Sequence, residues 1–310
     1  MNKINRVNTK KLTWVDINHP SRSDLGFMKT KHKFSEEDIQ NALPSRHAQR
    51  PRVLVRNNYL FIVVLFPVYN YQTRSINAAE VDVFITNDHL FTIHDSKIKI
   101  IHSFFESIST DKTVRNSHQD DKPSFLFYEI LDKLYENVFP MLDNVNKDIK
   151  NIEENVFAQT NRDLIRDILI VKSNLLNFKR IMHAHRSMIK KLLKTEASYF
   201  GSSSFVQMYY SELFDHVKDI WGVLETYGES IESLENTSNA IIDQGVNRIV
   251  KTLTIVTVLL YPLSMLGGIF GMNARNMPII GNPLDFWILI GIMLTLSTTI
   301  YFVFKKKGWM

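Results

Sequence analysis

One stretch of the sequence joins an apolar helical pattern to a polar end that could bind an ion. Residues 261–278 read YPLSMLGGIFGMNARNMP, in which an apolar run passes directly into Gly271, Met272 and Asn273. A side-chain carboxamide carries an acceptor oxygen and no charge. Asn273 therefore places a neutral oxygen ligand at the end of an apolar segment. What this oxygen can bind depends on where that segment holds it.

Few other groupings of residues suggest chemistry. His183 and His185 are two residues apart, so on a helix they do not share a face, and no cysteine or acidic cluster accompanies them. We interpret them as surface or inter-helix histidines. The sequence shows no nucleophile with a base, no phosphate-binding glycine loop and no zinc signature. We therefore expect no enzyme activity and no organic cofactor.

Two uncharged runs near the C-terminal end are long enough to cross a bilayer. Residues 253–270 and 286–304 contain no charged side chain, and roughly 17 to 25 apolar residues span a bilayer as a helix. We predict transmembrane helices at 253–272 and 285–304, joined by an external loop at 273–284. The alternative is a pair of buried core helices.

Basic residues predict the orientation of these spans. Five of them flank the spans on one side: Arg248, Lys251, Lys305, Lys306 and Lys307. The loop has only Arg275, with Asp285 nearby, so the positive-inside rule places both termini, including the basic tail 305–310, in the cytoplasm. The basic N-terminal segment has no apolar core after it and is not predicted to be a cleaved signal peptide. We expect a multi-pass protein of the cell membrane.

The overall composition fits this assignment. The 310-residue chain has a net charge of +5 and no cysteine, which excludes a disulfide framework and a thiolate metal site and fits a large cytosolic part. Basic residues form no stripe with interleaved aromatic residues, so the excess charge is better explained by membrane flanks than by nucleic-acid binding.

The N-terminal part, residues 1–122, shows alternating strand and helix patterns. Residues 52–66 and 81–94 each contain two β-rich runs around an Asn-Asn or Asn-Asp pair, which tolerates the positive φ angles of hairpin turns. Ser35 and Asp38 have capping-box spacing for a short helix. We predict a cytoplasmic α/β domain with two hairpins in one sheet, ending in the polar stretch 107–123.

Helical patterns continue from there into the first span. Residues 123–203 form a predicted helical hairpin region, with helices at about 124–160 and 161–194, and residues 204–252 form a stalk helix. Apolar residues at alternating spacings of four and three indicate a heptad seam: Leu213, Val217, Ile220, Leu224, Tyr227, Ile231 and Leu234. After a slip near Ser238 the seam resumes at Ile242 and enters the first span.

No proline interrupts the stalk before Pro262, so the stalk and the first span form one predicted rod on the order of 100 Å long at 1.5 Å per residue. A seam on such a rod cannot be covered by doubling back, so we expect copies of the chain to pack around an axis. A two-span chain also cannot enclose an ion pathway alone. The first span is the better lining, because it carries Ser264, Gly267, Gly268 and Gly271, whereas the second span is bulkier.

These residues resemble the CorA family of magnesium transporters, whose signature is Gly-Met-Asn at the outer end of the first of two C-terminal helices. The resemblance extends to HAQRPRVLVRNNYLFIVVLF near the first hairpin and to YYSELFDHVKDI in the stalk. It covers nearly the whole chain. It implies a membrane α-helical protein with an α/β cytoplasmic domain, a stalk helix continuous with the first span, and a funnel-shaped homopentamer.

The resemblance also implies roles for residues of the first span. Gly271, Met272 and Asn273 would form the selectivity filter. Four further positions would line the pore: Asn247 at the inner end, Leu253 and Tyr261 as apolar constrictions, and Ser264 as a polar ring. Mg²⁺ keeps its waters, so a ring of neutral Asn273 oxygens could bind the hydrated ion without dehydrating it. Gly271 would let the backbone turn, and Met272 would pack as an apolar prop.

Two departures from the family pattern bear on conduction. Tyr261 stands where a smaller, methionine-like residue is expected, so the constriction differs or the ring faces a neighbouring helix. In the loop, Ile279 replaces a glutamate that the family often has, and Arg275 adds positive charge. We expect weaker electrostatic capture of cations at the entrance.

Regulatory Mg²⁺ in this family lies between the α/β domain of one subunit and the stalk of its neighbour. The matching acids are Asp38 and Glu212, with Asp215 one helical turn further on. A hard cation between them would relieve their repulsion and bias the interface. The simpler alternatives are that Asp38 caps its helix and that Glu212 is a solvated heptad flank.

Three functions remain open at this point. The first is passive uptake of Mg²⁺, possible also for Co²⁺ or Ni²⁺, gated by cytoplasmic Mg²⁺. The second is transport of zinc or another transition metal on the same fold. The third is a membrane-anchored coiled-coil sensor or scaffold that moves no ion, which would tolerate Asn273→Ala.

Overall fold

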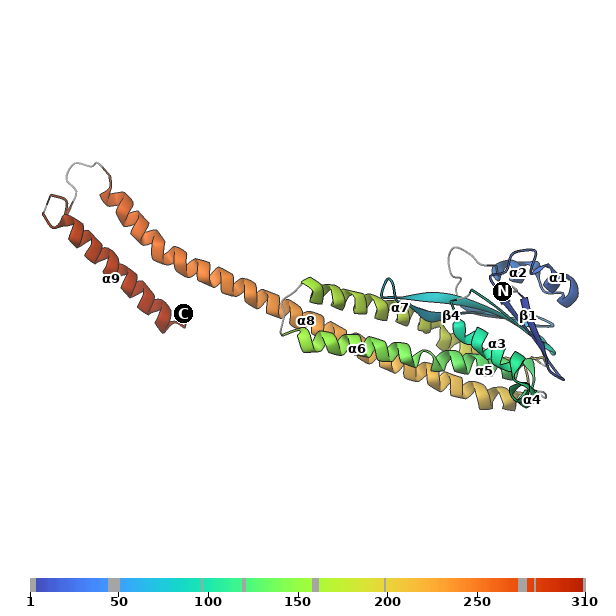
Figure 1. Ribbon diagram of the computed structural model, residues 1–310. Helices are drawn as coiled ribbons and strands as arrows, with labels where there is room; N and C mark the ends of the chain where they lie inside the picture. The colour runs from blue at the N-terminus through green and yellow to red at the C-terminus, as the bar shows by residue number, and fades with distance from the viewer. Residues whose placement is uncertain are drawn as a thin grey trace. The chain divides into compact units, whose positions relative to one another are not determined.

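The computed structural model describes residues 4–43, 51–95, 97–118, 121–157, 162–197, 199–272, 278–281 and 283–308. The chain forms two compact units, Met1–Glu235 and Asn236–Met310, each with its own packing. The first unit contains a sheet and its covering helices, and the second contains two long apolar helical segments (Figure 1).

Six strands form one sheet in the first unit, in the order β1-β2-β6-β5-β4-β3. Their bounds are β1 (Ile4–Asn8), β2 (Thr13–Asn18), β3 (Arg52–Val55), β4 (Leu60–Asn70), β5 (Ser75–Ile85) and β6 (His89–His94). Both predicted hairpins are confirmed, because β3 pairs with β4 and β5 with β6, each antiparallel. The sequence did not indicate β1, the long β4–β5 pairing, or the parallel pairing of β2 with β6.

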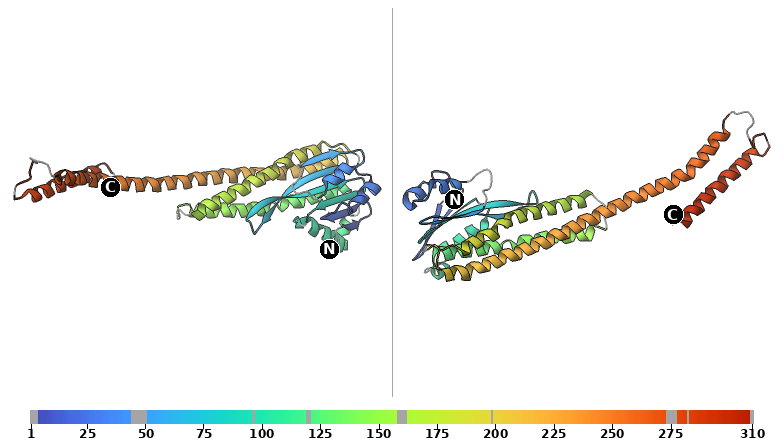
Figure 2. Two further views of the ribbon diagram at one scale, coloured as in Figure 1. Left: turned by 90° about the horizontal axis from the view of Figure 1, so that it is seen from above. Right: turned by 180° about the vertical axis from the view of Figure 1, so that it is seen from behind.

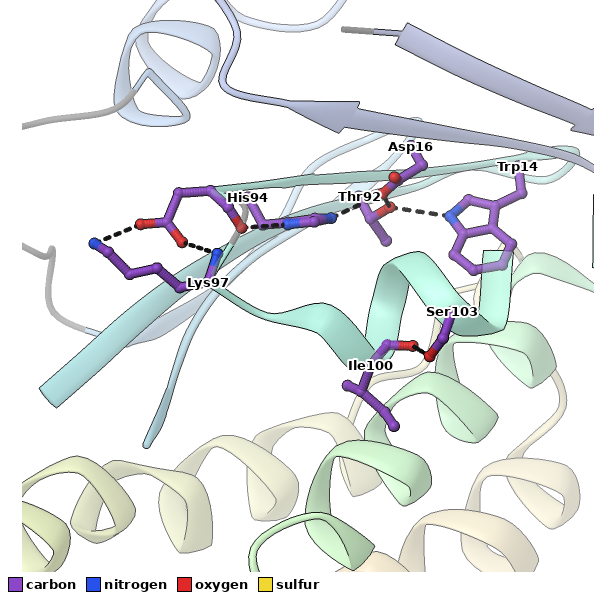
Figure 3. Close-up of polar contacts among 8 residues, drawn as sticks. Trp14, Asp16, Thr92, His94, Lys97, Ile100 and Ser103 are labelled. Carbon is purple, nitrogen blue, oxygen red and sulfur yellow. Dashed lines mark hydrogen bonds and ion pairs between the residues drawn. The ribbon is translucent and has the colours of Figure 1, made fainter. Parts of the chain in front are cut away.

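A buried polar network ties the two parallel strands together. Trp14 Nε1 donates to Thr92 Oγ1 (3.0 Å), and that hydroxyl donates to Asp16 Oδ1 (2.6 Å) (Figure 3). His94 Nε2 lies 3.1 Å from the same carboxylate oxygen, and its Nδ1 lies 2.7 Å from the carbonyl oxygen of Asp95. Burial lowers the pKa of His94, but the hydrogen bond to Asp16 and its charge outweigh burial and raise it. Both ring nitrogens face oxygen acceptors, an arrangement that only the charged imidazole satisfies fully and that the raised pKa favours.

Short helices cover one face of the sheet. These are α1 (Gly26–His32) and α2 (Glu36–Asn41). Met28 and Ile39 from these helices and Phe34 between them are buried against the sheet residues Phe84 and Phe91. Phe34 stacks on Phe84 with ring centroids 4.7 Å apart. This aromatic core holds α2, and with it Asp38, in place.

Longer helices cover the opposite face. They are α3 (Lys99–Thr110), α5 (Pro123–Glu136) and α7 (Arg162–Leu193). Trp14 packs edge-on against Phe105 of α3 (4.9 Å between centroids), and Phe66 of β4 packs against Tyr135 of α5 (5.4 Å). Asn174 of α7 accepts a hydrogen bond from the backbone N–H of Ile76 (2.9 Å). The sheet therefore lies between two layers of helices.

The polar stretch 107–123, predicted as the end of the α/β domain, contains helical segments. Helix α3 extends to Thr110, and α4 (Lys112–Ser117) follows at once. Asp111 starts α4, because its carboxylate accepts the N–H of Thr113 (2.7 Å). The predicted helix at 124–160 is in fact two, α5 and α6 (Phe139–Asn155), and Pro140 sits in the first turn of α6, where proline is tolerated.

Helix α8 (Ser203–Phe270) joins the predicted stalk and the first predicted span in one continuous helix. It runs for 68 residues without a break and includes Pro262. Its sequence contains both the predicted stalk and most of the first predicted span. The boundary between the two compact units falls inside it, after Glu235.

The first half of the heptad seam is buried inside the first unit. Five of its members are at most 2% exposed: Leu213, Val217, Ile220, Leu224 and Ile231. Tyr210 of α8 donates to the carbonyl oxygen of Ser124 in α5 (2.9 Å), and Lys172 of α7 pairs with Glu235 of α8 (2.5 Å). The expectation that the whole seam needs other copies of the chain is wrong for this half, because α5 and α7 cover it.

In the second unit, α9 (Asp285–Lys306) runs back alongside the end of α8 (Figure 1 and Figure 2). A Cβ on Gly267 would meet the Met293 Cε at 3.9 Å, which is ordinary contact distance. Each of these helices contains an 18-residue segment whose mean hydropathy is 2.0. By length and composition the described residues thus contain two helices able to cross a membrane, as predicted.

Candidate ion pathway and acidic sites

The four predicted pore positions all lie on α8 in the second unit: Asn247, Leu253, Tyr261 and Ser264. Together with Gly271 after the helix end, they fall within about a third of the helix circumference at 3.6 residues per turn. We call these five residues the α8 stripe. Leu253 is 65% exposed and Tyr261 70%, so the part of the chain that the structure describes covers neither.

Small and polar residues also lie on this side of α8. Thr257 lies one turn after Leu253, and its hydroxyl donates to the Leu253 carbonyl oxygen (2.8 Å), so its polar group is satisfied within the helix. Ser264 and Gly268 follow along the same side and are exposed. Small side chains of this kind let apolar helices approach closely.

The end of α8 is formed by a close approach that only glycine allows. The N–H of Gly271 donates to the carbonyl oxygen of Gly267 (3.0 Å), and a Cβ on Gly271 would lie 2.9 Å from that same oxygen. Real Cβ atoms essentially never come so close to a backbone oxygen. Glycine is therefore needed at this position, because a side chain would not fit.

The loop between α8 and α9 is only partly described. Asn273 and Arg275 lie outside the described residues. Met272 is 63% exposed, so its predicted packing is not made among the described residues. Ile279 has a φ of 80°, an unusual conformation for a β-branched residue.

Asp38 is held by an ion pair and does not cap its helix. Its carboxylate is fully buried and accepts from Arg56 Nε (2.9 Å) and Nη2 (2.7 Å) and from the Tyr59 hydroxyl (2.6 Å). Ser35 stands at the N-cap but makes no side-chain capping bond, so the capping-box prediction is wrong. Burial raises the pKa of Asp38, but hydrogen bonds from Arg56 and Tyr59 outweigh it and hold that pKa below its usual range.

Glu212 lies beside a second carboxylate that the sequence analysis missed. Glu212 Oε2 accepts from the Tyr128 hydroxyl (2.8 Å), and Asp132 of α5 lies 3.4 Å from His216 Nδ1, one turn along α8 from Glu212. Burial raises the pKa of Asp132, and the negative charges of Glu136 and Glu212 add to this. The spacing of Tyr128 and Asp132 on one face of α5 was the available signal.

The structure does not bring Asp38 and Glu212 together within one chain. Asp38 lies in α2 on one face of the sheet, whereas Glu212 lies in α8 against α5, which covers the other face. Asp215 is exposed, three residues after Glu212. A site shared by Asp38 and Glu212 would need two copies of the chain.

The two histidines of α7 contact neighbouring elements of the first unit. His185 is buried, with Nδ1 2.9 Å from the Tyr135 hydroxyl and Nε2 2.6 Å from the Leu65 carbonyl oxygen. Burial lowers its pKa to about 4, so it is neutral and donates to Leu65. His183 is exposed and lies against Trp221 of α8, with ring centroids 6.0 Å apart. Their interpretation as surface and inter-helix residues is confirmed.

Comparison with known proteins gives one consistent family. The sequence profile of the CorA-like Mg²⁺ transporter protein family matches residues 9–306. The cobalt/magnesium transport protein CorA of Methanocaldococcus jannaschii is 25% identical over 302 residues, which cover 96% of this chain and 92% of that one. Its counterpart in Thermotoga maritima is 22% identical over 302 residues, covering 96% of this chain and 83% of that one.

The fold agrees with this match. The complete structure of the CorA magnesium transporter from Methanocaldococcus jannaschii superposes with a TM-score of 0.82 at 24% identity, covering 97% of this chain and 92% of the other. The shared features are the α/β unit, the long helix and the two C-terminal apolar helices. The chain therefore belongs to the CorA family of divalent cation transporters.

Proposed function

We propose that the chain forms a homopentamer in the cell membrane and admits Mg²⁺ passively, with Co²⁺ and Ni²⁺ as further substrates. Both termini lie in the cytoplasm in this arrangement. The observation that carries the proposal is the α8 stripe, which lies along one side of a long apolar helix and leads to Gly271. Since two apolar helices cannot enclose a pathway, other copies supply the remaining walls.

The stripe residues, and Asn273 two residues beyond Gly271, have distinct tasks in this proposal. Asn273 amides, brought together by symmetry, bind the water shell of Mg²⁺ through neutral oxygens, because this ion dehydrates reluctantly. Ser264 hydroxyls provide a second polar ring. Leu253 and Tyr261 form apolar constrictions, which can close a pore by excluding water. Inward movement is driven by the membrane potential, worth roughly 2.3 kcal/mol per charge for each 100 mV.

Gating by cytoplasmic Mg²⁺ is the second part of the proposal. Glu212 and Asp215, with Asp132 beside Glu212, offer carboxylate oxygens on the outside of the α5–α8 pair. A hard cation there would offset their repulsion and stabilise one arrangement of neighbouring copies. Asp38 of a neighbouring copy could join only if Arg56 leaves its carboxylate, so cation binding at Asp38 competes with an existing ion pair.

Ion flux into liposomes tests the proposal. Purified full-length chain is reconstituted with a Mg²⁺-sensitive dye inside, with and without a negative-inside potential, and compared with Asn273→Ala. We expect potential-driven Mg²⁺ entry with wild type and its loss in the variant. Entry of Zn²⁺ without Mg²⁺ would favour the transition-metal alternative. Absence of flux for any metal, at low internal metal concentration, would favour a scaffold.

A further inference from the structure

Three metal-ligating side chains meet where α4 connects to α5 in the first unit. His118 directly follows α4, Asp121 lies in the connection, and Glu129 lies in α5. One ligand atom from each residue lies within 4.8 Å of the other two. None of these residues belongs to the α8 stripe, and they are separate from Asp38 and Glu212.

The imidazole of His118 is oriented for a ligand at Nε2. Its Nδ1 lies 2.7 Å from the Val114 carbonyl oxygen, so Nδ1 carries the donated proton, and Nε2 lies 2.8 Å from Glu129 Oε2. The ring packs edge-on against Phe104 of α3, with centroids 6.1 Å apart. Metal-binding histidines almost always donate their other N–H to a carbonyl or carboxylate, which fixes the tautomer and the ring orientation.

The elements around this cluster are tied to one another. Asp111 caps the start of α4, and the guanidinium of Arg115 donates to the carbonyl oxygens of Ile108 (3.0 Å) and Ser109 at the end of α3. The His118 side chain is 10% exposed and that of Glu129 is 26% exposed. The donor atoms are thus held in place by packing, with a route to solvent past Glu129.

We propose that His118, Asp121 and Glu129 bind a transition-metal dication such as Zn²⁺, Co²⁺ or Ni²⁺. One imidazole nitrogen and two carboxylates form a mixed ligand set that suits these ions, with water completing the coordination. Mg²⁺ prefers oxygen ligands alone, so this site discriminates against the ion proposed for the pathway. A bound metal would brace α4 against α5.

The competing explanation is a structural ion pair between His118 and Glu129 that binds no metal. The chain offers a matched control for it, because His102 and Glu106 of α3 form a similar pair at 3.2 Å on an exposed helix face. That pair has the same imidazole and carboxylate types but is not part of the three-residue cluster.

Equilibrium dialysis with Zn²⁺ separates these explanations. Untagged full-length chain in detergent is dialysed at mildly alkaline pH, since a ligating imidazole must be deprotonated, with excess Mg²⁺ to fill all-oxygen sites. The chain contains no cysteine, so thiolates do not contribute. Wild type is compared with His118→Gln, Glu129→Gln and His102→Gln, each first shown by gel filtration to elute like wild type.

We expect His118→Gln and Glu129→Gln to bind one Zn²⁺ fewer per chain than wild type, and His102→Gln to bind the same number. The proposal is overturned if the first two variants bind as much as wild type, or if His102→Gln loses as much as they do. If His118→Gln does not elute like wild type, Glu129→Gln alone gives the same two outcomes.

Discussion

In the first unit, the pKa of a buried histidine depends on the groups that its ring contacts. His94 and His185 are both buried, yet the pKa of His94 is raised and that of His185 falls to about 4. The difference lies in the partner, because His94 faces the carboxylate of Asp16, whereas His185 faces a hydroxyl and a carbonyl. Burial alone favours the neutral ring, and only a nearby negative charge reverses this.

His185 makes stability fall in acid. Its pKa is about 4 in the fold and near 6.5 when unfolded, so its contribution is complete above 6.5 and is lost as pH falls towards 4. This difference between the folded and the unfolded pKa corresponds to about 3 kcal/mol in the free energy of unfolding. We expect wild type to lose more stability than His185→Gln between neutral pH and pH near 4, measured by urea unfolding. The exposed His183→Gln serves as control and should follow wild type; parallel pH profiles for wild type and His185→Gln would refute the argument.

Gly271 should tolerate no side chain. A Cβ there would lie 2.9 Å from the backbone oxygen of Gly267, so Gly271→Ala must displace the end of α8. We expect most Mg²⁺ flux into liposomes to be lost. Gly291→Ala in α9 is the control, since its Cβ would meet no atom within 4 Å in the chain. Wild-type flux in Gly271→Ala would show that this close approach is unimportant.

At the scale of elements, features that depend on local sequence were predicted better than pairings between segments far apart in the sequence. The two hairpins and the continuous α8 follow from turn residues and from periodicity, which are local. The parallel β2–β6 pair depends on contacts 76 and more residues apart, such as Thr92 with Asp16, and no local signal encodes it. The capping alternative for Asp38 is wrong for the same reason, because its partner Arg56 lies 18 residues away in the next hairpin.

The two halves of α8 should respond differently to truncation of a leucine. Leu224 is fully buried in the first unit, so Leu224→Ala should destabilise it by about 2 to 5 kcal/mol. Leu253→Ala, at a position 65% exposed in the chain, should change ion flux with little effect on unfolding of the first unit. Urea unfolding monitored by tryptophan fluorescence distinguishes the two variants. Equal destabilisation by both would contradict the distinction between the buried and the exposed half of α8.

At the scale of the whole molecule, we expect the acidic positions on α8 to link the cytoplasmic Mg²⁺ concentration to ion flux. If cytoplasmic Mg²⁺ closes the pathway through Glu212, then Glu212→Gln should conduct at internal Mg²⁺ concentrations that inhibit wild type. Removing one carboxylate from a hard-cation site should lower its affinity. Liposomes loaded with graded Mg²⁺ give the inhibition curve. An unchanged curve would remove Glu212 from the gating proposal.

The central claim, that the α8 stripe lines an ion pathway, can be tested directly because the chain has no cysteine. Ser264→Cys and Leu266→Cys place a thiol at nearly the same depth on opposite sides of α8, since two residues turn a helix by about 200°. Each variant is reconstituted and its Mg²⁺ flux measured before and after a water-soluble, charged thiol reagent. We predict that the reagent blocks flux through Ser264→Cys and leaves Leu266→Cys conducting. Block of Leu266→Cys alone, or of neither variant, would contradict the proposed pathway.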